Sequence, residues 1–115
     1  MQPEILKYLF DIQESILSIQ SYLTDERDFK KFQSNKLVKR AVERELEIIG
    51  EATNRILKLD NTIEISDARR IVDLRNWIIH GYDSVDDIII WGIVSRDIPI
   101  LKIQVELLLQ STDFD

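Results

Sequence analysis

The chain has 115 residues, of which 44% are hydrophobic and 31% are charged, and its net charge is −6 at pH 7. This composition is typical of a globular protein, and the length suits one domain, so we predict a single domain over residues 1–115. The absence of cysteine excludes disulfides and thiolate chemistry, and the acidic balance excludes a general nucleic-acid coat protein, so RNA would be bound only transiently or at a local positive cleft.

Targeting and membrane signals are missing from the sequence. No apolar run approaches the ~20 residues of a membrane span. The first ten residues, MQPEILKYLF, carry an acidic residue and no basic region ahead of their apolar stretch, so no secretory signal is predicted. We therefore expect no membrane association and a cytoplasmic location.

The N-terminal third of the chain predicts one helix and a connection. Residues 3–23 carry apolar side chains at spacings of three and four, and Pro3 suits a first helical turn. Residues 24–28 are polar and predict a connection. Phe29 and Phe32 are expected to anchor that connection on the core.

A second, long helix is predicted over residues 34–59. Ser34 or Asn35 is the expected N-cap, because both residue types accept hydrogen bonds from the first-turn amides. Gly50 lies in the helix interior, where glycine costs about 1 kcal/mol relative to alanine. Its presence there indicates the close approach of another backbone or of a ligand.

The C-terminal half predicts further helices. The third helix begins after Ser66, its expected cap, and ends at Gly81. The fourth begins at Ser84, and Pro99 is expected to kink or split it because proline lacks an amide proton and clashes with a preceding carbonyl. Apolar residues at 100–109 predict a last helix, followed by a frayed tail.

These elements predict an all-α, up-and-down bundle of four or five helices with short connections. The third and fourth helices are apolar over more of their circumference than a small monomeric bundle needs. We therefore expect a homodimer that forms through the region of the third helix.

The third helix contains the segment IVDLRNWIIHGY, which begins at Ile71. On an ideal helix Arg75 projects from the middle of an apolar arc, and His80, the sole histidine, lies at the C-terminal end, where the macrodipole favours its protonated form. Each residue alone has a structural interpretation: His80 as a cap, and Arg75 as the partner of a carboxylate such as Glu43 or Glu47.

Together, Arg75, Asn76, His80 and Tyr82 form the pattern R-N-x-x-x-H-x-Y. Arginine offers forked donors for phosphate oxygens, and histidine transfers protons near neutral pH. Asparagine can orient the scissile group or the imidazole. Metal-free RNA cleavage by 2′-hydroxyl attack needs these groups, and a two-fold dimer would supply a second His80 for the second proton transfer.

The R-x-x-x-x-H pattern resembles the signature of the HEPN superfamily of all-α ribonuclease domains. With Tyr82, the segment RAVERELEIIGEATNRI and the stretch from Trp91 to Pro99, the chain resembles the HepT toxins of prokaryotic HEPN–MNT (type VII) toxin–antitoxin pairs. The resemblance implies a homodimeric ribonuclease whose catalytic residues are Arg75, His80 and Asn76. It also implies a partner, a minimal nucleotidyltransferase antitoxin, that transfers AMP from ATP onto Tyr82.

Other functions remain open or are excluded. The chain could be a non-catalytic HEPN module that helps a nucleotidyltransferase hold nucleotide or substrate. A di-metal carboxylate site is excluded because Trp77 occupies the position where a Glu-x-x-His pair needs its acid, so no metal or cofactor is predicted. Cationic residues in the second quarter of the chain predict either a phosphate-tracking stripe or a solvated face: Lys30, Lys31, Lys36, Lys39, Arg40 and Arg44.

Overall fold

The computed structural model of the protein describes residues 1–23, 28–66, 68–79 and 87–112, and the described residues are helical with short turns. The predicted all-α class is confirmed. The helical elements, in chain order, are α1 (Pro3–Tyr22), α2 (Phe29–Ser34), α3 (Lys36–Leu59), α4 (Ala68–Ile79), α5 (Asp87–Gly92), the π-helical segment η1 (Ile93–Asp97) and α6 (Ile98–Thr112). None of these described helices combines the length and hydrophobicity that a membrane span requires.

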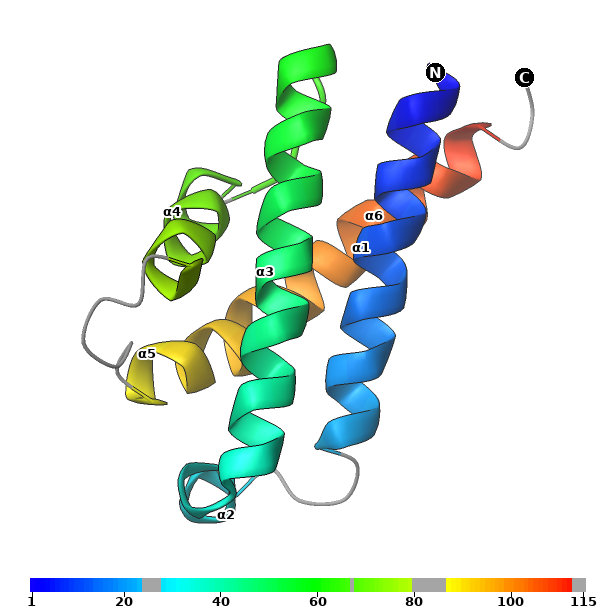
Figure 1. The fold of residues 1–115 in the computed structure, drawn as a ribbon. Coiled ribbons are helices and arrows are strands. Elements are labelled where there is room, and N and C mark those ends of the chain that lie inside the picture. The colour runs from blue at the N-terminus through cyan, green and yellow to red at the C-terminus, as the bar shows by residue number, and fades with distance from the viewer. Residues whose placement is uncertain (24–27, 67, 80–86, 113–115) are drawn as a thin grey trace.

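Helices α1 and α3 form the centre of the protein as an antiparallel pair (Figure 1). The centre of each predicted apolar stripe is buried, but its outer members are not: Phe10 and Leu17 on α1 and Leu37 on α3 are exposed. The buried apolar residues of the pair are Ile5, Leu9, Ile12, Ile16 and Ile19 on α1 and Val42, Leu46, Ile49, Ala52 and Ile56 on α3.

A short helix, α2, directly follows residues 24–28, the predicted connection. The Asp28 carboxylate accepts a hydrogen bond from the Lys30 amide at 2.9 Å and so caps α2. Phe32 is buried, and its ring centroid lies 5.2 Å from that of Trp91, while Phe29 meets the same indole edge-on at 6.0 Å. The two phenylalanines therefore anchor the segment as predicted, and α2 itself is the addition.

The start and end of α3 are set by two polar side chains. Asn35 Oδ1 accepts a hydrogen bond from the Val38 amide at 3.1 Å, so Asn35 is the N-cap. After the helix, Asp60 Oδ1 accepts from the Thr62 amide at 2.9 Å, which closes the turn that follows.

Pro99 does not split the last helical segment. Residues Asp87–Thr112 run as one continuous rod that crosses the α1–α3 pair obliquely (Figure 1). The chain widens into the π-helical turn η1 just before Pro99, and the Ile98 amide donates to the Ile93 carbonyl. A wider turn accommodates the missing proline amide without reversing the chain, so the predicted kink is replaced by a π segment. Helix α6 also continues to Thr112, into the segment predicted to be frayed.

Candidate functional site

Helix α4 packs against α3 at Gly50, which confirms the predicted close approach. A methyl group added at Gly50 would overlap the Arg75 Cβ and would lie 3.0 Å from Arg75 Cγ and 3.1 Å from the Ile71 carbonyl oxygen. The neighbouring α4 side chains Ile71 and Leu74 are buried in the core. Only glycine lets the Arg75 stem cross α3 at this depth, so Gly50 determines where the arginine lies.

The Arg75 guanidinium makes two polar side-chain contacts among the described residues. Its Nη2 lies 2.6 Å from Glu51 Oε2, and its Nη1 donates to Asn76 Oδ1 at 2.9 Å. The Arg75 side chain is 26% exposed, and its Nε has no hydrogen-bond partner among the described residues. The two adjacent motif residues Arg75 and Asn76 are therefore in contact, with one guanidinium nitrogen left over.

The carboxylate beside Arg75 is Glu51, and this corrects the expected pairing with Glu43 or Glu47. Glu43 pairs with Arg40 at 3.2 Å, and Glu47 pairs with Arg44 at 2.9 Å, both within α3. The physical reason is the register of the two helices. Since Arg75 crosses α3 at Gly50, the next residue along α3 is the one whose carboxylate reaches the guanidinium.

Glu51 is shared between two guanidinium groups. Arg55 Nε donates to Glu51 Oε1 at 2.8 Å, while Arg75 contacts the other oxygen. The hydrogen bond from Arg55 is the largest cause that lowers the pKa of Glu51, and the charge of Arg75 lowers it further against the opposing effect of burial. Glu51 therefore remains ionised in mildly acidic solution and holds the arginine pair together.

An open groove of about 480 Å³ begins at this cluster. Its walls are one side of α1, one side of α3 and the Arg75 side chain of α4. A second hollow of about 250 Å³ adjoins it, because Tyr8, Glu51 and Arg55 line both. The combined groove is thus a polar channel that leads away from the arginine of the motif.

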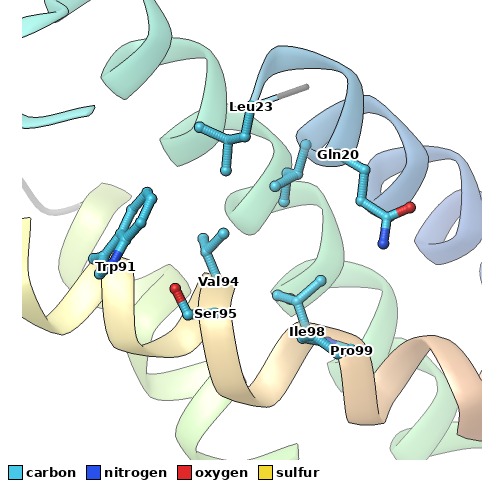
Figure 2. Close-up of a pocket in the computed structure, with 8 residues that line it drawn as sticks. Gln20, Leu23, Trp91, Val94, Ser95, Ile98 and Pro99 are labelled. Atoms are coloured by element: carbon cyan, nitrogen blue, oxygen red, sulfur yellow. The ribbon is translucent and has the colours of Figure 1, made fainter. Parts of the chain in front are cut away.

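A different hollow, shown in Figure 2, lies between the C-terminal end of α1 and the π segment. Its lining is mainly apolar and includes Leu23, Trp91 and Val94. The volume of about 50 Å³ suits one or two water molecules rather than a substrate. We therefore place the candidate site at the Arg75 groove.

Two residues of the predicted site, His80 and Tyr82, lie outside the described residues, as does the expected helix end at Gly81. Helix α4 carries the chain to Ile79, directly before His80. Within the described part of the chain, no three His, Cys, Asp or Glu side chains are grouped as metal ligands. The roles assigned to His80 and Tyr82 stay predictions.

Three of the six residues of the predicted cationic stripe are neutralised by ion pairs. Lys39 lies 3.1 Å from Asp87, and Arg40 and Arg44 bind Glu43 and Glu47. For these three cations the solvated-face interpretation holds, since each already has an acidic partner.

A family model described as "HepT-like: Ribonuclease HepT-like" matches residues 12–108, a span that includes α3, α4, α5 and Arg75. The chain belongs to the HepT-like ribonuclease family. This confirms the resemblance drawn from the motif. Among curated relatives, a Methanocaldococcus jannaschii protein named "Putative RNase" is 37% identical over 90% of this chain and 95% of its own length.

Further HepT-like relatives cover the chain to a similar extent. The Thermococcus cleftensis protein named "Probable ribonuclease HepT" is 39% identical over 83% of this chain and 86% of its own length. Another M. jannaschii "Putative RNase" is 30% identical over 96% of this chain and 95% of its own length. No solved structure matches the chain significantly.

Sequence reasoning did not identify Glu51, Arg55 and Tyr8 as parts of the site of this HepT-like chain. One signal was present: Glu51 and Arg55 have the i, i+4 spacing of a helical ion pair, and Glu51 directly follows the unexpected Gly50. Tyr8 carried no such signal, because it reaches the groove from α1, far away in the sequence.

Proposed function

We propose that the protein is the ribonuclease toxin of a HEPN–MNT toxin–antitoxin pair and cleaves RNA without a divalent metal. The observation that carries the proposal is the placement of Arg75, five residues before His80 in the sequence: its stem is packed over Gly50 and its guanidinium lines an open polar groove. Family membership supports the same activity, since relatives are named as ribonucleases.

The proposed reaction is attack of a ribose 2′-oxygen on the adjacent phosphorus. His80 accepts the 2′-hydroxyl proton, the bond from phosphorus to the 5′-oxygen breaks, and that oxygen leaves with a proton from an acid. The products are a 2′,3′-cyclic phosphate and a 5′-hydroxyl. Arg75 stabilises the extra negative charge of the phosphorane, and Asn76, which accepts a hydrogen bond from Arg75, orients the guanidinium.

A homodimer is part of the proposal, because one histidine cannot serve as base and acid in the same step. Large apolar side chains remain exposed on the elements around the motif: Trp77 on α4 is 51% exposed, Ile88 on α5 is 64% exposed, and Leu107 on α6 is 59% exposed. Burying such side chains against a second copy would remove apolar surface from water. The second protomer would then bring its own His80 and Arg75 to the cleft.

Purified protein should cleave a defined single-stranded RNA in the presence of EDTA, and His80→Ala should abolish cleavage because the proton-transfer group is lost. The measurement is the rate of product formation on a denaturing gel, with the product ends identified by mass spectrometry. An RNA with a single 2′-deoxy substitution at the cut site should resist cleavage there. Equal cleavage by wild type and His80→Ala, or cleavage at the deoxy position, would contradict the proposal.

A second candidate is a non-catalytic module that assists a nucleotidyltransferase. The observation that favours it is the ion pair between Arg75 and Glu51, which gives the arginine a structural partner inside the chain. On this hypothesis Arg75 stabilises the packing of α4 against α3, and the protein does not cleave RNA in the assay above. The protein would still bind its nucleotidyltransferase partner, and His80→Ala would be tolerated.

We also propose that the antitoxin neutralises the protein by joining AMP to Tyr82. The tyrosine hydroxyl would attack the α-phosphate of ATP, form a phosphodiester and release pyrophosphate, placing an anion beside the catalytic cations. Co-expression with the antitoxin should add the mass of one AMP to wild-type protein and none to Tyr82→Phe. Tyr22→Phe, which changes a tyrosine on α1, is the matched control and should be modified normally. Modification of Tyr82→Phe to the wild-type extent would contradict the assignment.

A further inference from the structure

The groove beside Arg75 extends well beyond the residues that the cleavage step uses. It continues along α1 and α3 past Tyr8 and Arg55 to Lys58. Its larger part, about 480 Å³, lies in the range of small-ligand pockets, roughly 300–1,000 Å³. The site therefore has room for more than a single phosphate.

The lining of the groove carries an excess of positive charge in an acidic protein. Five basic side chains line the two hollows, Lys7, Arg44, Arg55, Lys58 and Arg75, against four acidic ones, Glu4, Asp11, Glu47 and Glu51. One positive charge remains, while the whole chain carries −6. The excess is greatest at Glu51, where one carboxylate neutralises two guanidinium groups. The groove is therefore slightly positive on a chain that is acidic overall, which favours phosphate binding there over the rest of the surface.

Several of these cations are available to a ligand. The Lys7 side chain is 69% exposed and that of Arg44 is 68% exposed, although each also contacts an acid one helical turn away. Exposed ion pairs of this kind contribute about 0–1 kcal/mol, so a phosphate oxygen can take the place of the carboxylate at small cost.

Tyr8 gives the groove an aromatic surface. Its ring is partly buried against the core, and Lys7 Nζ lies 4.9 Å from the ring centroid. Asn54, in the adjoining hollow, offers an amide that both donates and accepts hydrogen bonds. Cations that follow a backbone, together with an aromatic ring on which a base stacks, are the usual components of a single-stranded nucleic-acid site.

We propose that this groove binds the nucleotide next to the scissile phosphate of a single-stranded RNA substrate, with its base against Tyr8 and its phosphate near Lys7 and Arg55. The inference rests on the proposed ribonuclease function and deepens it, since it assigns a substrate-binding subsite and the residues that line it. Arg75 belongs to both the lining of this subsite and the motif. The shared chemistry is that of a nucleoside phosphate, which a free mononucleotide also has.

The test measures binding separately from cleavage. A fluorescent single-stranded oligonucleotide with 2′-O-methyl riboses cannot be cleaved, and its dissociation constant is measured by anisotropy with the full-length protein. Tyr8→Ala should weaken binding roughly tenfold, because alanine removes the stacking surface, whereas Tyr8→Phe should bind within about twofold of wild type. Tyr22→Ala changes an exposed tyrosine of the same helix outside the groove and should leave binding unchanged.

Because the Tyr8 ring contacts the core, Tyr8→Ala could misfold. A pair of charge-reversal variants tests the groove without changing the core. Lys7→Glu and Lys36→Glu both replace an exposed lysine, but only Lys7 lines the groove. Lys7→Glu should weaken RNA binding several-fold more than Lys36→Glu and should reduce the salt dependence of binding. Equal effects of the two changes, or wild-type binding by folded Tyr8→Ala, would overturn the proposal.

Three further outcomes distinguish the possible ligands and the two proposals. If Tyr8→Ala weakens the binding of AMP but leaves the dissociation constant for RNA unchanged, the groove is a mononucleotide site and the RNA subsite is wrong. If wild type binds RNA through Tyr8 but never cleaves it, the ribonuclease proposal fails and the subsite stands. If wild type cleaves RNA and Tyr8→Ala leaves KM unchanged, the subsite fails and the ribonuclease proposal stands.

Discussion

Replacing Gly50 with alanine should lower the free energy of unfolding by about 2 kcal/mol, the middle of the range for overpacking a core. The added methyl group would overlap the Arg75 Cβ and crowd the Ile71 carbonyl, and both belong to the body of α4 rather than to a flexible side-chain end. Helix α4 must therefore move away from α3. The measurement is urea-induced unfolding followed by circular dichroism at a fixed protein concentration.

Gly92→Ala is the matched control for this change. Gly92 also lies in helical backbone, with φ −61° and ψ −42°, but no described atom lies within 4 Å of an added methyl group. There the higher helix propensity of alanine acts alone, and stability should rise by up to about 1 kcal/mol. If Gly50→Ala proved as stable as wild type, or if the two changes shifted stability in the same direction, the proposed helix contact would be wrong.

The regular helices were predictable from the sequence because their burial is periodic. The α1 stripe from Ile5 to Ile19 recurs at the helical spacing and is buried throughout, so its boundaries followed to within about a residue. The short helix α2 was not predicted, since six residues are too few to show a period. Its position depends on the packing of Phe29 and Phe32 against Trp91, which is distant in sequence.

The candidate site was predictable only in part, for a geometric reason. The motif identified Arg75 and Asn76 from spacing, and Gly50 indicated a close approach without naming what approaches. The partner of Arg75 depends on the register between α3 and α4, which is a property of the packed pair. Periodicity assigns residues to a face of one helix but does not align two helices, so Glu51 was missed.

The groove was even less predictable from the sequence than the partner of Arg75. Its lining comes from α1, α3 and α4, and Tyr8 and Arg75 are 67 positions apart in the chain. No local pattern connects them. The single-sequence signal for a positive site was also obscured, because the chain is acidic overall and the cations of the groove alternate with acids along the same helices.

The placement of Arg75 leads to the second prediction with a large effect. Arg75→Ala should lower kcat/KM for RNA by roughly 10²–10³-fold, the usual cost of removing one preorganised group that stabilises developing negative charge. Arg75→Lys should recover little of this loss, because an ammonium keeps the charge but lacks the planar fork that reaches Glu51 and Asn76 together. The measurement is steady-state cleavage of a short fluorescent RNA by folded variants.

Glu51→Gln separates a catalytic role of Arg75 from a purely structural one. The amide keeps the shape of the side chain but releases the guanidinium, so kcat should fall, by up to about 10²-fold for a misplaced group. The groove loses a negative charge at the same time, so KM should stay constant or fall. The pKa of Glu51 is lowered in the folded protein, chiefly by the Arg55 hydrogen bond. In wild type, ionised Glu51 should therefore keep Arg75 in position until the pH falls through that lowered pKa. If Arg75 only joined α4 to α3, Arg75→Ala and Glu51→Gln would lower stability while kcat of the folded protein stayed at the wild-type level.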